Sequence, residues 1–164
     1  MPESSEINIP VGFRFNPTEK ELVCDYLAKK VWSCSGNPNY IYKQFSSTAV
    51  IECSEVYNKH PWLLMVSTEG AAYRMERDGA VYFFVRMTKK NANGWRPNRR
   101  INGDMGFWKS TSSGKPVVDK HGNVLGMKKS LVYYVLKEGA DDEDKKTCSS
   151  HQNGGSKTSW IMHE

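Results

Sequence analysis

The chain has 164 residues, of which 38% are hydrophobic and 12% aromatic, and its formal net charge is +5 at neutral pH. These values are typical of one globular domain and exclude a disordered chain. No apolar run approaches the ~18 residues that a membrane-spanning helix needs, and the first ten residues lack the pattern of a secretory signal. We therefore expect one intracellular domain over residues 9–164, with reduced cysteines and a flexible N-terminus over residues 1–8.

A helix is predicted from residue 18 onward. Thr18 is suited to cap its start, and Glu21 follows at the spacing of a capping box. Apolar side chains then recur at helical spacing as far as Val31. The stretch SCSGNPN at 33–39 is expected to end this helix. A second, shorter helix is expected around residues 47–58.

The second half of the chain predicts strands. Alternating β-forming residues occupy 79–87 and 106–111, a hairpin turn is expected at 121–123, and further strands at 127–136 and 159–163. An acidic, Gly/Ser-rich insert at 138–157 is expected to be a mobile loop. Helices followed by strands indicate an α+β fold with a mainly antiparallel sheet.

Enzymatic and metal chemistry find little support in the sequence. There is no nucleophile-elbow, zinc-protease or phosphate-loop motif, and the four histidines are far apart. Cys148 and His151 are one helical turn apart but have no second pair at zinc-ligand spacing. We therefore predict a protein that is not an enzyme and that holds no metal or cofactor.

The positive charge is concentrated in the middle of the chain. Residues 71–137 carry 14 basic and 4 acidic side chains, a net +10, whereas residues 1–70 have a net charge of −2 and residues 138–164 of −3. Such a polarised distribution favours a polyanionic partner, and nucleic acid is the partner we expect.

Two stretches of this basic segment are suited to contact nucleic acid. The segment KKNANGWRPNRR (89–100) places five cations around turn residues. Guanidinium forks match phosphate oxygens or the guanine edge, and lysine supplies a point charge. In the stretch MGFWKSTSSGKP (105–116), Phe107 and Trp108 are expected to anchor a strand in the core. Lys109, a run of hydroxyl side chains and Lys115 come after them. The segment 89–100 alone is equally compatible with an ordinary hairpin loop kept soluble by charge, but this alternative weakens beside the second stretch and Lys128 and Lys129.

Five blocks of the chain resemble the plant NAC transcription factor domain. They are IPVGFRFNPTEKELVCDYL, HPW, the run from YFFVRM to GFWKST, VLGMKKSLVYYV and SWIMHE, in the order typical of that family and across residues 9–164. The resemblance implies a twisted antiparallel sheet flanked by a few helices, and a nuclear, double-stranded DNA-binding transcription factor. It also implies homo- or heterodimerisation and insertion of the WKST-bearing edge strand into the major groove, at sites that commonly contain a CGTG core.

The resemblance also implies site residues. The cations that contact DNA in the family fall on Lys90, Arg96, Arg99 and Lys109, and the lysines of the GMKK block on Lys128 and Lys129. Neighbouring residues of the same two basic stretches complete the predicted DNA-binding set: Arg100, Ser110, Thr111 and Lys115.

The family's dimer interface corresponds to the N-terminal box of this chain. It covers Ile9, Pro10, Val11, Gly12 and Phe13, with Arg14 and Glu21 resembling an intersubunit salt bridge. Glu21 has two interpretations, because the same carboxylate is the capping-box partner of Thr18, and the sequence does not choose between them.

The chain departs from the family at the tip and in the dimer box. The WKATGxD pattern has become WKSTSSG, so that Ser112 replaces the tip glycine and Gly114 the acidic residue, and Lys20 replaces a carboxylate. Two alternatives to a DNA-binding factor therefore remain. One is a NAC-like dimerisation partner with weakened DNA binding that sequesters other family members. The other is a relative of the zinc-containing WRKY domain, against which the lack of a Cys/Cys/His/His set argues.

Overall fold

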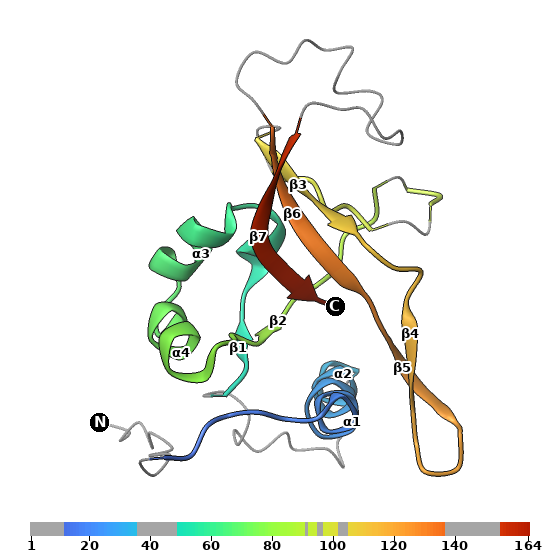
Figure 1. The fold of residues 1–164 in the computed structure, drawn as a ribbon. Coiled ribbons are helices and arrows are strands. Elements are labelled where there is room, and N and C mark those ends of the chain that lie inside the picture. Colours follow the sequence, from blue (N-terminus) through green and yellow to red (C-terminus); the bar gives the residue numbers. More distant parts are fainter. Residues whose placement is uncertain (1–11, 36–48, 91, 95–96, 102–104, 137–154) are drawn as a thin grey trace. The chain divides into compact units, whose positions relative to one another are not determined.

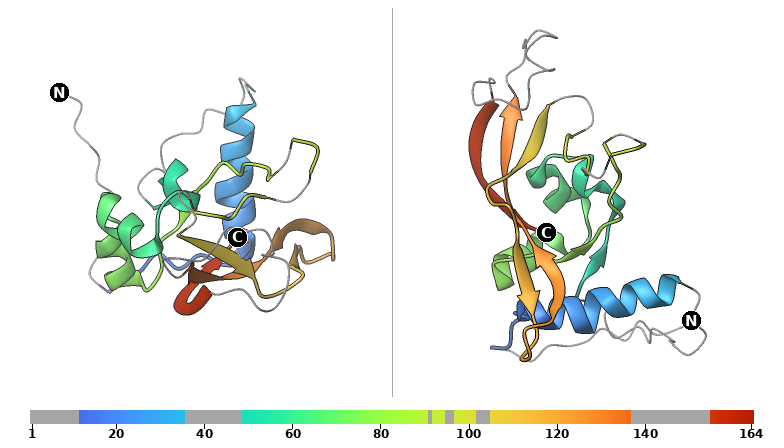
Figure 2. Two further views of the ribbon diagram at one scale, coloured as in Figure 1. Left: turned by 90° about the horizontal axis from the view of Figure 1, so that it is seen from above. Right: turned by 90° about the vertical axis from the view of Figure 1, so that its right-hand side faces the viewer.

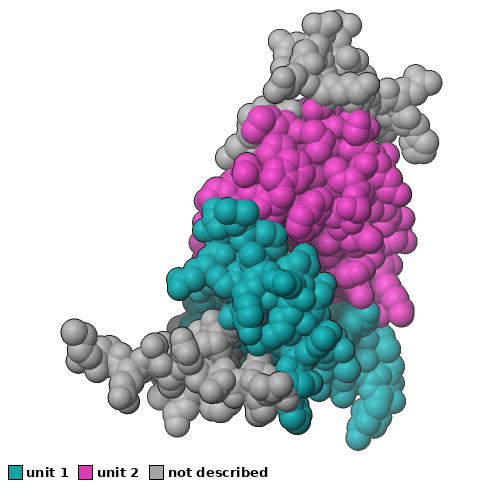
Figure 3. All heavy atoms as spheres, turned by 60° about the vertical axis from the view of Figure 1, so that its left-hand side comes forward, with its two compact units in different colours: residues 1–53, 65–85, 117–126 teal, residues 54–64, 86–116, 127–164 magenta. Residues whose placement is uncertain are grey.

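The structure is a computed structural model that describes residues 12–35, 49–90, 92–94, 97–101, 105–136 and 155–164. The chain divides into two compact units, which are coloured separately in Figure 3. Unit 1 comprises residues 1–53, 65–85 and 117–126, and unit 2 comprises residues 54–64, 86–116 and 127–164. Each unit is described by itself below.

The predicted first helix is present in unit 1. It runs through α1 (Glu19–Glu21), the π-helical segment η1 (Leu22–Leu27) and α2 (Ala28–Cys34), which form one continuous helix in Figure 2. The capping box is confirmed, because the Glu21 carboxylate accepts a hydrogen bond from the Thr18 backbone N–H at 2.7 Å and the Thr18 hydroxyl oxygen accepts one from the Glu21 N–H. This contact with the Thr18 backbone lowers the pKa of Glu21 below its ordinary value.

The elements around residues 47–87 differ from expectation. The expected helix over 47–58 is replaced by β1 (Ile51–Glu52) and the 3₁₀ helix η2 (Ser54–Tyr57). The strand expected over 79–87 is reduced to β2 (Phe83–Phe84), which pairs with β1 in parallel. Two helices that were not predicted, α3 (Pro61–Ser67) and α4 (Ala71–Asp78), lie between η2 and β2 in the sequence. Gly79 ends α4 with a φ of +74°, a left-handed conformation that suits glycine.

The predicted hairpin is formed by β4 (Lys115–Val118) and β5 (Val124–Lys128), which are hydrogen-bonded neighbours. Its turn is closed by Asp119, whose carboxylate accepts hydrogen bonds from the backbone N–H groups of His121 at 2.7 Å and Asn123 at 2.9 Å. The bonds from Asn123 are the main reason why the pKa of Asp119 is lowered.

Unit 2 contains a three-stranded antiparallel sheet in the order β3-β6-β7 (Figure 1). The strands are β3 (Gly106–Ser110), β6 (Ser130–Leu136) and β7 (Gly155–His163). The single strand expected over 127–136 is interrupted at Lys129, between β5 and β6. β7 begins at Gly155, so the last three residues assigned to the insert, 155–157, pair with β6. The rest of the insert lies outside the described residues. The predicted α+β class with mainly antiparallel strands is confirmed, and the β1–β2 pair is the parallel exception.

The core of unit 2 forms around Tyr133 of β6. Its side chain is fully buried, lies opposite Trp108 of β3 in the sheet register, and has its ring centroid 5.1 Å from that of Trp108. The Tyr133 hydroxyl and Nδ1 of His60 are joined by a hydrogen bond of 2.6 Å, and the His60 ring stacks on Trp62 at 4.4 Å. Burial raises the pKa of Tyr133 to about 12 and lowers the pKa of His60, so both side chains are held in their neutral forms.

Gly106, the first residue of β3, lies under the Tyr133 ring. A Cβ atom at this position would overlap the Tyr133 hydroxyl oxygen and lie 2.7 Å from the Tyr134 carbonyl oxygen. Because a backbone oxygen and a fully buried ring cannot move aside cheaply, only glycine fits here.

We predict that Gly106→Ala lowers the free energy of unfolding by about 1–3 kcal/mol, because it overpacks this contact. Chemical denaturation measures the loss. Gly126→Ala in β5 is the matched control, since its Cβ would meet Val23 at 3.4 Å, an ordinary van der Waals distance. Equal effects of the two substitutions would contradict the proposed role of Gly106.

Candidate nucleic-acid interface

The positive charge of the chain lies in unit 2. Its described residues include eleven Lys or Arg and two Glu, whereas the described residues of unit 1 include seven Lys or Arg and eight Asp or Glu. The polarisation seen along the sequence is therefore a difference between two compact parts of the fold. A polyanion that approaches the described residues of unit 2 therefore meets few carboxylates among them.

Backbone contacts connect the basic segment 89–100 to β3. The N–H of Asn98 donates to the Thr88 carbonyl at 2.8 Å, and Lys89 forms an antiparallel bridge with Pro97. Residues 99–101 then run alongside the start of β3, where the N–H of Trp108 donates to the Arg99 carbonyl at 2.9 Å. Within the described residues, this pairing with 99–101 ends at Trp108, one residue before Lys109.

The side chains of β3 alternate between the two faces of the sheet. Trp108 enters the core against Tyr133, as predicted, whereas Phe107 is on the other face and stacks on Tyr134 with ring centroids 5.4 Å apart. The expectation that both aromatics enter the core is therefore wrong for Phe107, because neighbouring strand residues point to opposite faces. Lys109 is exposed on the face of Phe107, and its Nζ atom lies 5.8 Å from the centroid of the Tyr134 ring.

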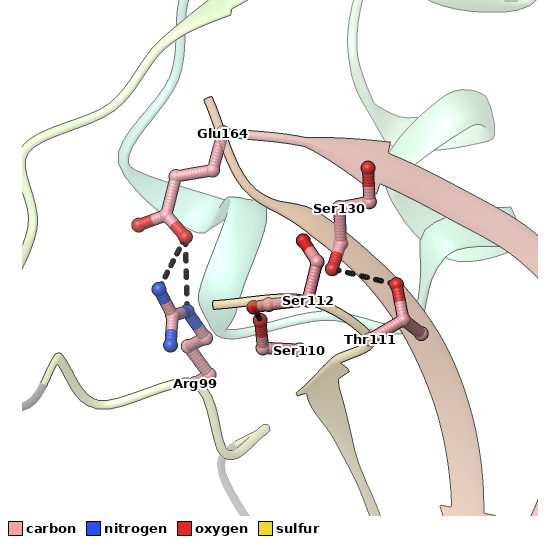
Figure 4. Close-up of polar contacts among 6 residues, drawn as sticks. All are labelled: Arg99, Ser110, Thr111, Ser112, Ser130 and Glu164. Atoms are coloured by element: carbon pink, nitrogen blue, oxygen red, sulfur yellow. Dashed lines mark hydrogen bonds and ion pairs between the residues drawn. The ribbon is translucent and has the colours of Figure 1, made fainter. Parts of the chain in front are cut away.

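A short turn after β3 forms the tip of this strand. The Ser110 hydroxyl donates to the Ser112 carbonyl at 2.7 Å, and the Thr111 hydroxyl donates to the Ser130 carbonyl at 3.1 Å (Figure 4). Phosphate oxygens only accept hydrogen bonds, so a contact from either hydroxyl to a phosphate would replace one of these bonds. The positive φ of the tip falls on Gly114, at +105°.

Arg99 is held by an ion pair within unit 2. Its Nε donates to Oε2 of Glu164 at 3.0 Å, and Nη2 makes a second, shorter contact with the same oxygen (Figure 4). Both side chains are largely buried, with 16% and 19% of their surface exposed. The buried Tyr57 lies beside the pair, and its pKa is raised to about 12, mainly by burial and further by the Glu164 charge. One edge of the Arg99 fork is therefore already occupied by a carboxylate, which the sequence did not predict.

The remaining predicted DNA-binding cations differ in exposure. Lys90 and Lys115 are exposed, whereas Arg100, Lys128 and Lys129 are half-buried. The Lys129 backbone exchanges two hydrogen bonds with Glu164, at 2.7 Å and 2.9 Å. Arg96 lies outside the described residues.

The predicted dimer residues are described in part. Ile9, Pro10 and Val11 lie outside the described residues. Gly12, Phe13 and Arg14 are exposed, and 68% of the Phe13 surface is open to solvent. The Glu21 carboxylate is bonded to Thr18 in the same chain, so the capping interpretation is confirmed, and a dimer contact stays a prediction.

Neither a metal site nor a membrane-spanning helix occurs in the described part of the chain. It contains no group of three His, Cys, Asp or Glu side chains placed to hold a metal ion. None of its helices is long and apolar enough to cross a membrane. Cys148 and His151 lie outside the described residues.

The chain belongs to the No apical meristem (NAM) protein family, whose model matches residues 10–164. It is 37% identical over 160 residues to Protein ATAF2 of Arabidopsis thaliana and 35% identical over 161 residues to NAC domain-containing protein 68 of Oryza sativa subsp. japonica. It is also 34% identical over 164 residues to NAC transcription factor 56 of Arabidopsis thaliana.

These alignments cover 98–99% of this chain but only 36–44% of each relative. The chain thus spans less than half of the length of the relatives that it matches. The shared segment contains the basic segment 89–100, the edge strand β3 and the N-terminal box.

We predict that Glu164→Gln lowers the free energy of unfolding by about 1–3 kcal/mol, because it removes charge-assisted hydrogen bonds from a largely buried arginine. Glu52→Gln is the matched control. Glu52 pairs with Lys30 at 2.6 Å, but 74% of its side-chain surface is exposed, and such pairs contribute only ~0.2–1 kcal/mol. Thermal and urea unfolding measure both variants. A loss no larger than that of the control would mean that the Arg99–Glu164 pair is not structural.

Proposed function

We propose that this chain is the DNA-binding domain of a nuclear transcription factor, which binds double-stranded DNA sequence-specifically as a dimer. In this proposal, the edge strand β3 enters the major groove with its WKST tip. The supporting observation is the position of Lys109. It is exposed on an edge strand, one residue beyond the point where pairing with the cation-rich segment 99–101 ends.

The geometry of an edge strand suits this role. The major groove admits a strand or β-ribbon, and there lysine can donate to O6 or N7 of guanine. Trp108 anchors the strand from the opposite face, so that Lys109 extends from a rigid support. A rigid support reduces the ordering cost of binding.

The other predicted cations supply sequence-independent affinity in this proposal. Lys90, Arg100, Lys115, Lys128 and Lys129 all belong to unit 2 and neutralise backbone phosphates near the inserted strand. Arg99, whose charge is paired with Glu164, offers only the free edge of its guanidinium. Such contacts position a protein on the duplex and make its binding salt-dependent, whereas base contacts specify the sequence.

We predict that the dimer binds a CGTG-core duplex with a salt dependence typical of about 6–8 neutralised phosphates, a slope of log K against log salt near −5 to −7. Lys109→Gln should weaken binding to the CGTG-core duplex severalfold and reduce the discrimination against the scrambled duplex, because it removes a base contact. Fluorescence anisotropy at several salt concentrations, on CGTG-core and scrambled duplexes, measures both quantities.

Lys120→Gln is the control, because Lys120 is exposed in the hairpin turn of unit 1 and is not among the predicted DNA-binding residues. A salt-independent affinity of the unmodified chain, or equal effects of the two substitutions, would overturn the proposal. If the unmodified chain dimerises but does not bind any duplex, the dimerisation partner that sequesters other family members becomes the better account.

The proposed dimer forms through the N-terminal box. The support is the exposed ring of Phe13 next to the exposed Arg14, in the segment where the NAC resemblance places the subunit interface. Because an exposed Arg–carboxylate pair contributes only ~0.2–1 kcal/mol, apolar and strand contacts supply most of the affinity, and Arg14 and Glu21 set the register.

Charge reversal tests this interface. We expect Arg14→Glu to weaken the dimer, and the double variant Arg14→Glu with Glu21→Arg to restore part of the affinity, as measured by analytical ultracentrifugation. Thr18→Ala is the control, since it disrupts the capping box without a change of charge. If Thr18→Ala weakens the dimer as much as Arg14→Glu, or the double variant recovers nothing, Glu21 acts only as a cap.

A further inference from the structure

The tip after β3 carries four consecutive hydroxyl side chains, which differ in their bonding. Those of Ser110 and Thr111 donate to the carbonyls of Ser112 and Ser130, respectively. Ser112 and Ser113 are exposed, and within the described residues neither hydroxyl has a hydrogen-bond partner. Two of the four hydroxyls are therefore accessible to a modifying enzyme without the loss of an internal bond.

Lysines flank Ser112 at equal spacing along the sequence. Lys109 precedes it by three residues and Lys115 follows it by three, and both side chains are exposed. A third lysine approaches the same turn, because a Cβ atom on Gly114 would lie 3.3 Å from Cγ of Lys129. The described part of the tip, residues 109–115, contains no acidic side chain.

We propose that Ser112 is a phosphorylation site for a basophilic serine kinase, and that its modification releases the domain from DNA. The second part rests on the proposed function. The Ser112 hydroxyl oxygen forms a bond to the γ-phosphorus of a nucleoside triphosphate, the bond to the bridging oxygen breaks, and the nucleoside diphosphate leaves. The hydroxyl proton passes to the kinase base.

Charge patterns in the substrate direct such kinases, and here Lys109 supplies the cation three residues before the acceptor. For Ser113 the same two lysines lie four residues before and two after, so Ser112 is the better match. Ser110 and Thr111 would have to leave their carbonyl partners first.

The consequence follows from electrostatics. A phosphoserine carries about −1.5 to −2 charges at neutral pH and accepts strong hydrogen bonds from lysine. At Ser112 it would neutralise the cations of the tip and repel the DNA phosphates where β3 is proposed to enter the groove. Loss of affinity and a less steep salt dependence should therefore occur together.

The site is tested with ATP and the catalytic subunit of a basophilic serine kinase on the intact chain, followed by peptide mapping. We expect one phosphate on Ser112, and no incorporation at the tip of Ser112→Ala. Lys109→Gln should slow the reaction at least fivefold, whereas Lys120→Gln should not. Phosphate on other residues only would overturn the proposal.

The consequence is tested with phosphoserine incorporated at position 112 during translation. We expect CGTG-core duplex binding to weaken at least tenfold near 0.1 M salt, with a slope less steep by about 1 or more. Removal of the phosphate with a phosphatase should restore the affinity to within threefold of that of the unmodified chain. Unchanged binding by the phosphorylated chain would overturn the proposal, whereas failure of the unmodified chain to bind duplex would overturn the proposed function instead.

Discussion

The packing of Tyr133 over Gly106 is the contact on which unit 2 depends. A fully buried hydroxyl without a partner costs about 1–3 kcal/mol, so the Tyr133 hydroxyl needs the hydrogen bond that His60 provides. To reach His60, the ring crosses the backbone of β3 at the one residue that has no side chain. This contact fixes the register of β3 against β6, and with it the face on which Lys109 lies.

The remaining cations of unit 2 follow from the same register. Once the register of β3 is fixed, residues 99–101 pair along its outer edge. Residues 97–98 in turn pair with residues 88–89. Cations from three separate parts of the sequence thus come to belong to one compact unit. In contrast, the ion pairs Lys29–Asp25, Lys30–Glu52 and Arg77–Asp78 all lie within unit 1.

Some local signals were read correctly from the sequence, whereas long-range contacts were not. The capping box of Thr18 and the hairpin turn at 121–123 depend on neighbours within four residues, so the sequence predicts both. The helix α4 was missed although its residues follow a helical period, because few of them are apolar and only Ala71 is buried. The Arg99–Glu164 pair joins residues 65 positions apart, and no periodicity or local motif reports such a contact. The strand predicted at 159–163 is four residues shorter than β7 for the same reason. Only pairing with β6 makes Gly155–Thr158 part of the strand.

The Arg99–Glu164 pair changes what the proposed interface can read. With one edge of Arg99 occupied, the exposed cations nearest the tip are lysines, which are point charges without a fixed fork. A lysine can donate to O6 or N7 of guanine, but it lacks the fixed fork with which an arginine reads the same edge. Part of the sequence preference should then come from the shape and hydroxyls of the tip, where Gly114 takes the positive φ and Ser112 takes the position of the family's glycine. Chemical changes at this turn should therefore alter which sites are bound more readily than substitutions elsewhere on unit 2.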